Sequence, residues 1–335
     1  MAFALPFLVT FAAITFCVLI NAAAPPYGQL SVKGNKLYGS NGKQVQLIGM
    51  SLFWSQWNSA FWNSVTVQKL KCNWRVNVIR APLGVESGGY LQYPAREKAK
   101  LITVVDAAIA AGIYVIIDWH YTSSKAYTSQ AVALFTEMSK KYGKQANILY
   151  EVWNEPVDNS WAGQLVPYHQ TLIKAIRAND PNNVIICGTP RYDMSLTEPA
   201  NSPIKGQKNI MYTFHWYAAD ASNGGGNGGD DALLAMAKSA YNKGLPLFCT
   251  EYGLASGSGN KTINLPQAKK WWAWMDANKI SHINWCIWDE PYNGNPIKKG
   301  TTSAQLHLDS ALSVNGKIVK GMIVSKNAAP SGCSG

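Results

Sequence analysis

Eight short apolar runs recur along the 335-residue chain and constrain its fold more than any other feature. Their starts lie 26 to 37 residues apart. Each run is rich in β-branched and aromatic residues and is too short for a helix, so each predicts a buried strand. The runs are Val45–Met50, Val76–Ala81, Ile113–Trp119, Ile148–Trp153, Val184–Gly188, Ile210–His215, Leu245–Thr250 and His282–Trp288.

Helix-like stretches occupy most of the gaps between these runs, and several are followed by a glycine, a common helix stop signal. They are Glu97–Ala111, Gln130–Tyr142, Gly163–Ala178, Asp230–Lys243 and Gln267–Asn278. A strand followed by a helix, repeated about every 35 residues, predicts an α/β fold, a single (β/α)8 TIM barrel over residues 25–325. A small N-terminal β-hairpin, Gln29–Val32 with Lys36–Tyr38, is expected to cap the bottom of this barrel.

The two ends of the chain differ from the barrel in composition. Met1–Ala24 carries no Lys, Arg, Asp or Glu, its core Phe3–Ile20 is apolar, and small residues follow. This pattern predicts a secretory signal peptide over residues 1–24 and hence a secreted, extracellular protein with no membrane association after signal removal. An uncleaved membrane anchor is the alternative. Residues 326–335, rich in Ala, Pro, Ser and Gly, predict a flexible C-terminal tail.

Five cysteines remain once Cys17 leaves with the signal peptide, and this odd number leaves at least one thiol unpaired. Cys187, Cys249 and Cys286 lie inside apolar runs and are expected to behave as small core residues. The pairing of the cysteines stays open. Asn260, in Asn260-Lys261-Thr262, is an acceptor for N-linked glycan if the source is a eukaryote.

The net charge of +11 favours polyanionic partners. The basic residues are scattered, however, and the sequence carries no helix-turn-helix, zinc-finger or RNA-recognition signature, so we expect no nucleic-acid partner. The glycine-rich segment Asn223–Gly229 lacks the Lys-Ser/Thr of a phosphate-binding loop and predicts a surface loop. A monomer is expected.

Polar and aromatic side chains gather where the predicted strands end. They are Arg80, His120, Asn154, Glu155, His215, Tyr217, Glu251 and Trp285. Because the reactive side chains of a TIM barrel lie at the C-terminal ends of its strands, we expect these residues to meet at one mouth. Two carboxylates across a Trp-lined cleft suit glycoside hydrolysis, in which one protonates the leaving oxygen and the other acts at the anomeric carbon. The sequence therefore predicts a glycosidase.

The motifs at these strand ends resemble glycoside hydrolase family 5, most closely its cellulase (endo-β-1,4-glucanase) subfamily of bacteria and plant-parasitic nematodes. In chain order they are Gly49–Trp54, Asp118–His120, Tyr150–Pro156, Thr213–Tyr217 and Thr250–Gly253. The similarity spans roughly Gln29 to Trp288. It implies a secreted retaining endo-β-1,4-glucanase that hydrolyses internal bonds of cellulose-like polysaccharides, with a β-glucan, for instance in a plant cell wall, as substrate.

The resemblance also implies roles for the residues of the reaction centre. Glu155 would be the general acid/base and Glu251 the nucleophile, with carboxyl groups ~5–5.5 Å apart. Arg80 and Tyr217 would orient Glu251, and His215 would hydrogen-bond near Glu155. The negative charge of Glu251 is expected to raise the pKa of Glu155.

Four further residues would bind the sugar. His120 and Asn154 would contact the unit in the −1 subsite, Trp285 would stack beneath it, and Trp57 would stack on the unit in the −2 subsite. The resemblance implies no cofactor, and no zinc-ligand spacing is evident in the sequence, so no metal is expected.

Two positions depart from the subfamily. Thr122 stands where the subfamily usually has a second histidine, and Glu290 stands where it has a lysine that reaches substrate hydroxyls. Both positions line subsites in the family, so the same chemistry on mannan, xylan or xyloglucan stays open. A non-catalytic carbohydrate-binding barrel is a further alternative, but it would need the loss of Glu155 or Glu251.

The remaining tryptophans fall into two groups. Trp54, Trp62, Trp161 and Trp216 lie in predicted loops on the catalytic side, and for each of them contact with substrate and packing are equally favoured. Trp271, Trp272 and Trp274 lie on a predicted helix and are expected to pack.

Overall fold

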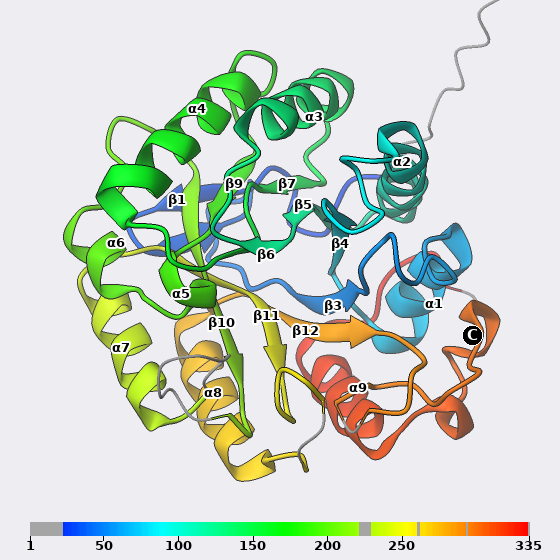
Figure 1. The fold of residues 1–335 in the computed structure, drawn as a ribbon. Coiled ribbons are helices and arrows are strands. Elements are labelled where there is room, and N and C mark those ends of the chain that lie inside the picture. Colours follow the sequence, from blue (N-terminus) through cyan, green and yellow to red (C-terminus); the bar gives the residue numbers. More distant parts are fainter. Residues whose placement is uncertain (1–22, 221–228, 260–261, 293, 334–335) are drawn as a thin grey trace, which may run out of the picture.

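Eight parallel strands close into one barrel at the centre of the molecule (Figure 1). The computed structural model describes residues 23–220, 229–259, 262–292 and 294–333. Around the barrel the strands are β3 (Ile48–Leu52), β4 (Val78–Gly84), β5 (Tyr114–His120), β7 (Ile148–Glu151), β9 (Val184–Cys187), β10 (Ile210–Tyr217), β11 (Leu247–Gly253) and β12 (His282–Ile287), which pairs back to β3. The predicted (β/α)8 TIM barrel is confirmed.

Helices surround the barrel on the outside (Figure 1). They are α1 (Ser64–Trp74), α2 (Pro94–Ala111), α3 (Thr128–Tyr142), α4 (Val166–Arg177), α5 (Pro190–Asp193), α6 (Thr197–Asn201), α7 (Asp231–Asn242), α8 (Leu265–Asn278) and α9 (Val314–Lys326). Short elements add to these: a π-helix at Trp161–Leu165 that leads into α4, and 3-10 turns at Ser303–Gln305 and Asp309–Ala311. Side-chain caps define several starts; the Asp230 carboxylate, for example, accepts bonds from the backbone N–H groups of Ala232 and Leu233 at the start of α7.

Three features of the structure differ from the predicted pattern. Helices α1 and α9 were not recognised in the sequence, although Asn63 and Ser313 cap them through side-chain bonds. Between β9 and β10 there are only the short helices α5 and α6, because the 26 residues between the starts of these runs leave no room for a long helix. The first strand also starts later than predicted, since the backbone N–H of Val45 donates to the carbonyl of Leu37 in the hairpin, at 2.9 Å.

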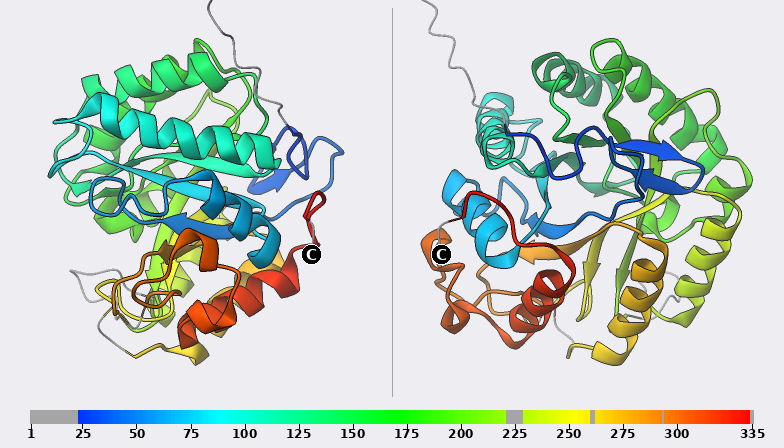
Figure 2. Two further views of the ribbon diagram at one scale, coloured as in Figure 1. Left: turned by 90° about the vertical axis from the view of Figure 1, so that its right-hand side faces the viewer. Right: turned by 180° about the vertical axis from the view of Figure 1, so that it is seen from behind.

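The predicted hairpin closes the end of the barrel where the strands begin. Strands β1 (Ser31–Lys33) and β2 (Lys36–Tyr38) pair antiparallel, and the right-hand view of Figure 2 shows them lying across this end. Leu30 and Leu37 of this segment belong to one apolar cluster with side chains from the barrel strands. The hairpin therefore buries apolar surface that would otherwise face water.

The barrel strands change character along their length. Because side chains alternate between the two faces of a strand, residues two apart face the same side. On β4, Val78 belongs to the apolar cluster beneath the hairpin, and Arg80, two residues later, is buried among carboxylates. Strand β7 shows the same change: Leu149 belongs to the apolar cluster, and Glu151, two residues later, contacts Arg80. The same set of strands thus carries an apolar plug at one end and charged groups at the other.

The C-terminal segment is attached to the barrel at two points. The side-chain amide of Asn327 donates to the carbonyls of Ile48 and Arg75, at 3.0 and 2.8 Å. Cys333 forms a disulfide with Cys72 of α1. The predicted flexible tail, residues 326–335, is therefore held against the bottom of the barrel over its described part.

Other sequence predictions concern smaller features. Cys187, Cys249 and Cys286 are free and buried, as expected for small core residues. Residues 1–22 of the predicted signal peptide, Asn260 of the sequon and residues 223–228 of the glycine-rich segment lie outside the described residues. Within the described ranges, no helix is long and apolar enough to cross a membrane.

Candidate active site

Arg80 lies at the centre of the charged end of the barrel and is fully buried. Its Nε lies 2.8 Å from Glu151, one terminal nitrogen lies 2.9 Å from Glu251, and the other lies 3.0 Å from Asp118 and 2.5 Å from the Asn154 side-chain oxygen. Burial alone would lower the pKa of Arg80, but the negative charges of Asp118, Glu151 and Glu251 raise it well above its usual value. Arg80 therefore stays positive and links four different strand ends.

Glu251 is held by two donors from different strands. It lies on β11, where a register shift between β11 and its neighbours lets its side chain face the mouth. One carboxylate oxygen accepts from Arg80, and the other accepts from the Tyr217 hydroxyl at 2.5 Å. Burial, followed by the charge of Glu251, raises the pKa of Tyr217 well above its usual value, so Tyr217 remains a hydrogen-bond donor.

Glu155 is held from two sides at the end of β7. It begins the two-residue strand β8 (Glu155–Pro156), which pairs with β6 (Thr122–Ser123) and brings Thr122 opposite Glu155. The Thr122 hydroxyl donates to Oε2 of Glu155 at 2.7 Å, and Nδ1 of His215 lies 3.0 Å from Oε1.

Burial raises the pKa of Glu155 to about 7, although the bond from Thr122 and the charge of Arg80 act in the opposite direction. The main cause is therefore desolvation, and not the charge of Glu251 on which the sequence interpretation relied. Burial also lowers the pKa of His215 to about 4, so this ring is neutral near neutral pH. Between about pH 4 and pH 7, a protonated carboxyl and a neutral imidazole thus face one another.

The two carboxyl groups lie close together across the mouth. One carboxylate oxygen of Glu155, one of Glu251 and one ring nitrogen of His215 all lie within 4.8 Å of one another. Such a trio is also a possible set of metal ligands. We assign no metal to it, because a cation beside Glu251 would face the positive Arg80 guanidinium, 2.9 Å from that carboxylate.

Aromatic rings flank this pair of carboxyls. The His120 ring stacks on Trp285, with centroids 5.1 Å apart, and meets the edge of Trp54 at 4.1 Å. Asp118 contacts Nδ1 of His120 at 2.7 Å and thereby fixes the orientation of the ring. Trp57 stacks on Trp54 at 4.6 Å and is 56% exposed, so its outer face is open to a ligand.

For the other four tryptophans predicted on the catalytic side, the sequence left open whether each contacts substrate or packs in the core, and their burial distinguishes the two. Trp62, Trp161 and Trp216 are buried and pack in the core, whereas Trp54 is partly exposed at the mouth. On α8, Trp271 and Trp272 are buried and Trp274 packs against the core, as predicted.

Four polar residues of the site were not recognised as site residues in the sequence. Asp118 and Glu151 lie inside strands that were read as apolar runs, and burial is the main cause that raises the pKa of each, to about 8 for Asp118. Thr250 donates to Glu151 at 2.7 Å. Asp193 is buried with one oxygen 3.5 Å from Nε2 of His215. A charged residue inside an apolar run is the signal that could have identified Asp118 and Glu151.

Asp193 lies in a strained segment. Arg191, Tyr192 and Asp193 all have φ between 56° and 59°, a left-handed conformation that costs free energy for residues other than glycine. The segment is held by a bond from the backbone N–H of Thr189 to the Asp193 carboxylate. This strained segment places the Asp193 carboxylate beside His215.

Comparisons with known proteins point to one family. Residues 38–291 match the model of the family described as "Cellulase (glycosyl hydrolase family 5)". Endoglucanase Z of Dickeya dadantii is 42% identical over 92% of this chain, and an endoglucanase of Clostridium saccharobutylicum is 38% identical over 90%. The chain spans 69% and 66% of the lengths of these two relatives.

Solved structures of similar proteins superimpose on this chain. A structure from Cytophaga hutchinsonii superimposes with a TM-score of 0.85 at 42% identity, covering 90% of this chain and 96% of its own. The catalytic domain of Thermobifida fusca endoglucanase Cel5A superimposes with a TM-score of 0.81 at 29% identity, covering 89% of this chain and 97% of its own.

Proposed function

This chain belongs to the cellulase family, glycosyl hydrolase family 5, and from that premise we propose that it is a retaining endo-β-1,4-glucanase. Membership makes it a glycoside hydrolase. The proposal adds the mechanism, the residues that carry it and the substrate, an internal β-1,4 bond of a cellulose-like glucan. It rests most heavily on one observation, the approach of one oxygen of Glu155 and one of Glu251 to within 4.8 Å.

In the first step Glu251 attacks the anomeric carbon while Glu155 protonates the leaving oxygen. The bond from the anomeric carbon to that oxygen breaks, and a bond to a Glu251 oxygen forms, which leaves a covalent glycosyl-enzyme. Arg80 and Tyr217 orient the Glu251 carboxylate for this attack. A pKa of about 7 supports the assignment of Glu155 as the acid, since the group holds its proton in mildly acidic solution.

In the second step Glu155 acts as the base. It takes a proton from a water molecule, whose oxygen attacks the anomeric carbon and displaces Glu251. Two displacements at the same carbon return the original anomeric configuration. The short separation of the carboxyls supports this route, because inverting enzymes keep theirs ~6.5–9.5 Å apart to accommodate water.

The sugar in the −1 subsite would lie over Trp285 and receive hydrogen bonds from His120 and Asn154. The stacking of Trp285 on His120 fixes both groups at the mouth, which supports this assignment. Trp57, with its exposed face, would carry the next sugar in the −2 subsite. Flat aromatic faces pack against the apolar faces of a pyranose ring.

The experiment that tests the proposal combines substrate choice and stereochemistry. Reducing sugar released from carboxymethylcellulose, mannan and xylan would be compared, and the first product anomer from cellopentaose would be identified by proton NMR. We expect release from carboxymethylcellulose above the other two and an initial β-anomer. An initial α-anomer would exclude the double displacement.

A second candidate is the same chemistry on mannan, xylan or xyloglucan. The observation that favours it is the pair of departures at Thr122 and Glu290, which stand in place of residues that line subsites in the family. Faster release from mannan or xylan than from carboxymethylcellulose would replace the glucanase assignment with this one and would leave the mechanism intact.

We also propose that the protein is a secreted monomer that acts on plant cell walls. The uncharged apolar segment over residues 1–24 supports secretion, and the net charge of +11 supports attraction to pectin-rich walls. Elution of the purified enzyme from such walls by salt would support this attraction, whereas retention independent of salt would contradict it.

A further inference from the structure

A cavity of about 760 Å³ lies at the end of the barrel opposite the catalytic mouth, and its volume is within the range of pockets that hold small ligands. Asn77 and Ile113, which line it, directly precede β4 and β5, so the cavity lies where the strands begin. Its walls come from the C-terminal ends of α1 and α2, the segment before the hairpin and the C-terminal segment. Ala23 and Ala24 also line it, and loss of the predicted signal peptide would remove them while leaving the other walls in place.

One wall of the cavity is fixed at both ends. It consists of residues 328–332, which the right-hand view of Figure 2 shows crossing α1. On one side of this wall, the Asn327 amide donates to two backbone carbonyls, and on the other side Cys333 is bonded to Cys72 of α1. The cavity is therefore formed before a ligand arrives, and binding requires little further ordering of the chain.

Lys71 and Arg75 bring two positive charges to this cavity. Lys71 is only 8% exposed, and within the described part of the chain its ammonium group contacts no acceptor and no carboxylate. Arg75 donates a single long bond, from Nη1 to the carbonyl of Val324 at 3.4 Å. Of the described residues that line the cavity, none is Asp or Glu. Because a buried cation without a partner is unfavourable and like charges four residues apart repel one another, this pair favours an anionic ligand.

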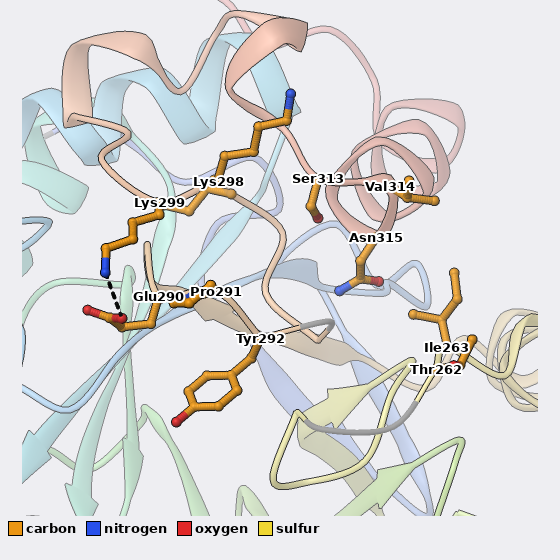
Figure 3. A pocket seen from close by; sticks show the side chains of 11 residues that line it. Thr262, Ile263, Glu290, Pro291, Tyr292, Lys298, Lys299, Ser313, Val314 and Asn315 are labelled. Atoms are coloured by element: carbon orange, nitrogen blue, oxygen red, sulfur yellow. Dashed lines mark ion pairs between the residues drawn. The ribbon is translucent and has the colours of Figure 1, made fainter.

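The hollow between the loop after β12 and α9 shows the opposite charge pattern (Figure 3). There Lys299 pairs with Glu290 at 3.8 Å, and Lys298 donates to the carbonyl of Ser310 at 2.9 Å. Both lysines of that hollow have partners within the chain. The charge of the cavity at Lys71 is not balanced in this way by any described residue, which distinguishes it from an ordinary solvated basic surface.

The other residues of the cavity define the body of the ligand. Tyr27 contributes an aromatic ring, and Gln68 and Ser331 contribute groups that can bond to hydroxyls. The remaining lining residues are mostly small and leave room for a ring: they include Ala110, Ala111, Gly112, Ala328, Ala329 and Pro330. A sugar ring that carries a carboxylate suits both features, since the ring packs on apolar and aromatic surface and the carboxylate pairs with a guanidinium and an ammonium group.

We propose that this cavity binds a uronic-acid unit of an acidic polysaccharide, with its carboxylate held by Lys71 and Arg75 and its ring packed against Tyr27. The site itself is inferred from the cavity, whereas the choice of a uronate among organic anions rests on the proposed function, in which the enzyme is attracted to pectin-rich walls. The cavity and the mouth lie at opposite ends of the barrel. An enzyme held through this cavity therefore keeps its mouth free to bind a glucan.

Calorimetric titration of digalacturonate into the purified enzyme tests the proposal, with galabiose, its neutral counterpart, titrated in parallel. We expect digalacturonate to bind at least about tenfold more tightly than galabiose, which lacks the carboxylates. Lys71→Met and Arg75→Gln should each weaken the binding of digalacturonate by about tenfold. Equal affinity for the two sugars, or an unchanged affinity for digalacturonate in both variants, would overturn the proposal.

Lys69→Met is the matched control. It removes the same charge from the same helix, but Lys69 does not line the cavity, so the affinity for digalacturonate should stay close to the wild-type value. A loss as large as that in Lys71→Met would overturn the site, because it would mean that the general positive charge of α1 attracts the ligand.

The nature of the anion and the independence of the site need two further measurements. Tighter binding of glucose 6-phosphate than of digalacturonate would overturn the uronate assignment, since Lys and Arg also pair with phosphate. Lys71→Met should hydrolyse carboxymethylcellulose at the wild-type rate, and a lower rate in a folded variant would contradict the separation of the cavity from the mouth. Salt-independent retention on pectin-rich walls would contradict the attraction in the proposed function, whereas the titration with digalacturonate decides the site by itself.

Discussion

The two ends of the barrel interior are built on the same strands but from opposite kinds of side chain. Strand β11 carries Phe248, which is buried in the apolar cluster beneath the hairpin, and three residues later Glu251, which contacts Arg80. Strand β5 carries Ile116 in the same cluster and, two residues later, Asp118. The end beneath the hairpin is filled by packed apolar side chains, and the catalytic end holds several buried ionisable groups around Arg80.

This contrast shows how the fold can hold charges that would otherwise be too costly to bury. Moving an ionised carboxylate out of water is unfavourable unless it is paired and hydrogen-bonded. The apolar end fixes the strands by burial of apolar area, and the strands then hold the acids at set distances from Arg80. We expect substitutions at one end to change mainly stability and those at the other to change mainly activity.

The largest effect is expected for Glu251→Gln. Loss of the attacking carboxylate should lower kcat by about 10³-fold or more, while the uncharged amide retains the shape of the side chain. Hydrolysis of carboxymethylcellulose and a thermal melt would be measured together. Glu137→Gln, at an exposed ion pair with Lys98, is the control and should keep wild-type activity. Activity near the wild-type value in Glu251→Gln would end the assignment of the nucleophile.

Arg80→Met is expected to affect both activity and stability. Removing the guanidinium leaves Asp118, Glu151 and Glu251 without their shared partner, and loss of one member of a buried ion pair costs about 3–5 kcal/mol. Denaturant unfolding would measure this change. Lys98→Met, at a partly exposed ion pair, should cost less than about 1 kcal/mol. An equal decrease in the free energy of unfolding in Arg80→Met and Lys98→Met would contradict the central role of Arg80.

Phe248→Ala tests the apolar end of the same strand as Glu251. Truncation of this fully buried ring should lower the free energy of unfolding by about 3–5 kcal/mol. At a temperature where the variant is folded, its kcat and its pH profile should match those of the wild-type enzyme. A shifted pH profile would break the division between the two ends, because it would mean that packing beneath the hairpin sets the electrostatics of the mouth.

The smallest effect is expected for Thr122→Val. The Thr122 hydroxyl bonds to Glu155 and lowers its pKa, so removal of that bond should raise the pKa of Glu155. Because Glu155 acts as the acid in its protonated form, the alkaline limb of kcat/KM should move to higher pH by about half a unit. Thr122→Ser retains the hydroxyl and should keep the wild-type profile. A shift to lower pH would contradict the sign of this argument.

Much of the fold was predictable from local pattern. Parallel strands covered on both faces are continuously apolar, so runs such as Ile113–Trp119 identify strands without knowledge of their neighbours. Helices α1 and α9 were missed, although their caps at Asn63 and Ser313 could have marked them. The disulfide between Cys72 and Cys333 joins residues 261 apart, and no local signal specifies such a pair.

The residues predicted for the site are brought together, but several of their partners were not predictable. The ends of strands meet at one mouth by the geometry of the barrel, which is why Arg80, Glu155 and Glu251 could be grouped from sequence alone. The bond from Thr122 to Glu155 depends on the two-residue pairing of β6 with β8, which is too short to recognise in a sequence. The cause of the raised pKa of Glu155 depends on burial, which only a complete packing arrangement determines.

Arg80 uses its Nε for Glu151, one terminal nitrogen for Glu251 and the other for Asp118 and Asn154. A lysine has a single ammonium group and cannot reach four partners in these directions. No single substitution at this position is therefore neutral, and simultaneous compensating changes on three other strands would be needed to replace it. The contacts of Arg80 do not involve Trp57, so substitutions in the loop around Trp57 are free of this constraint.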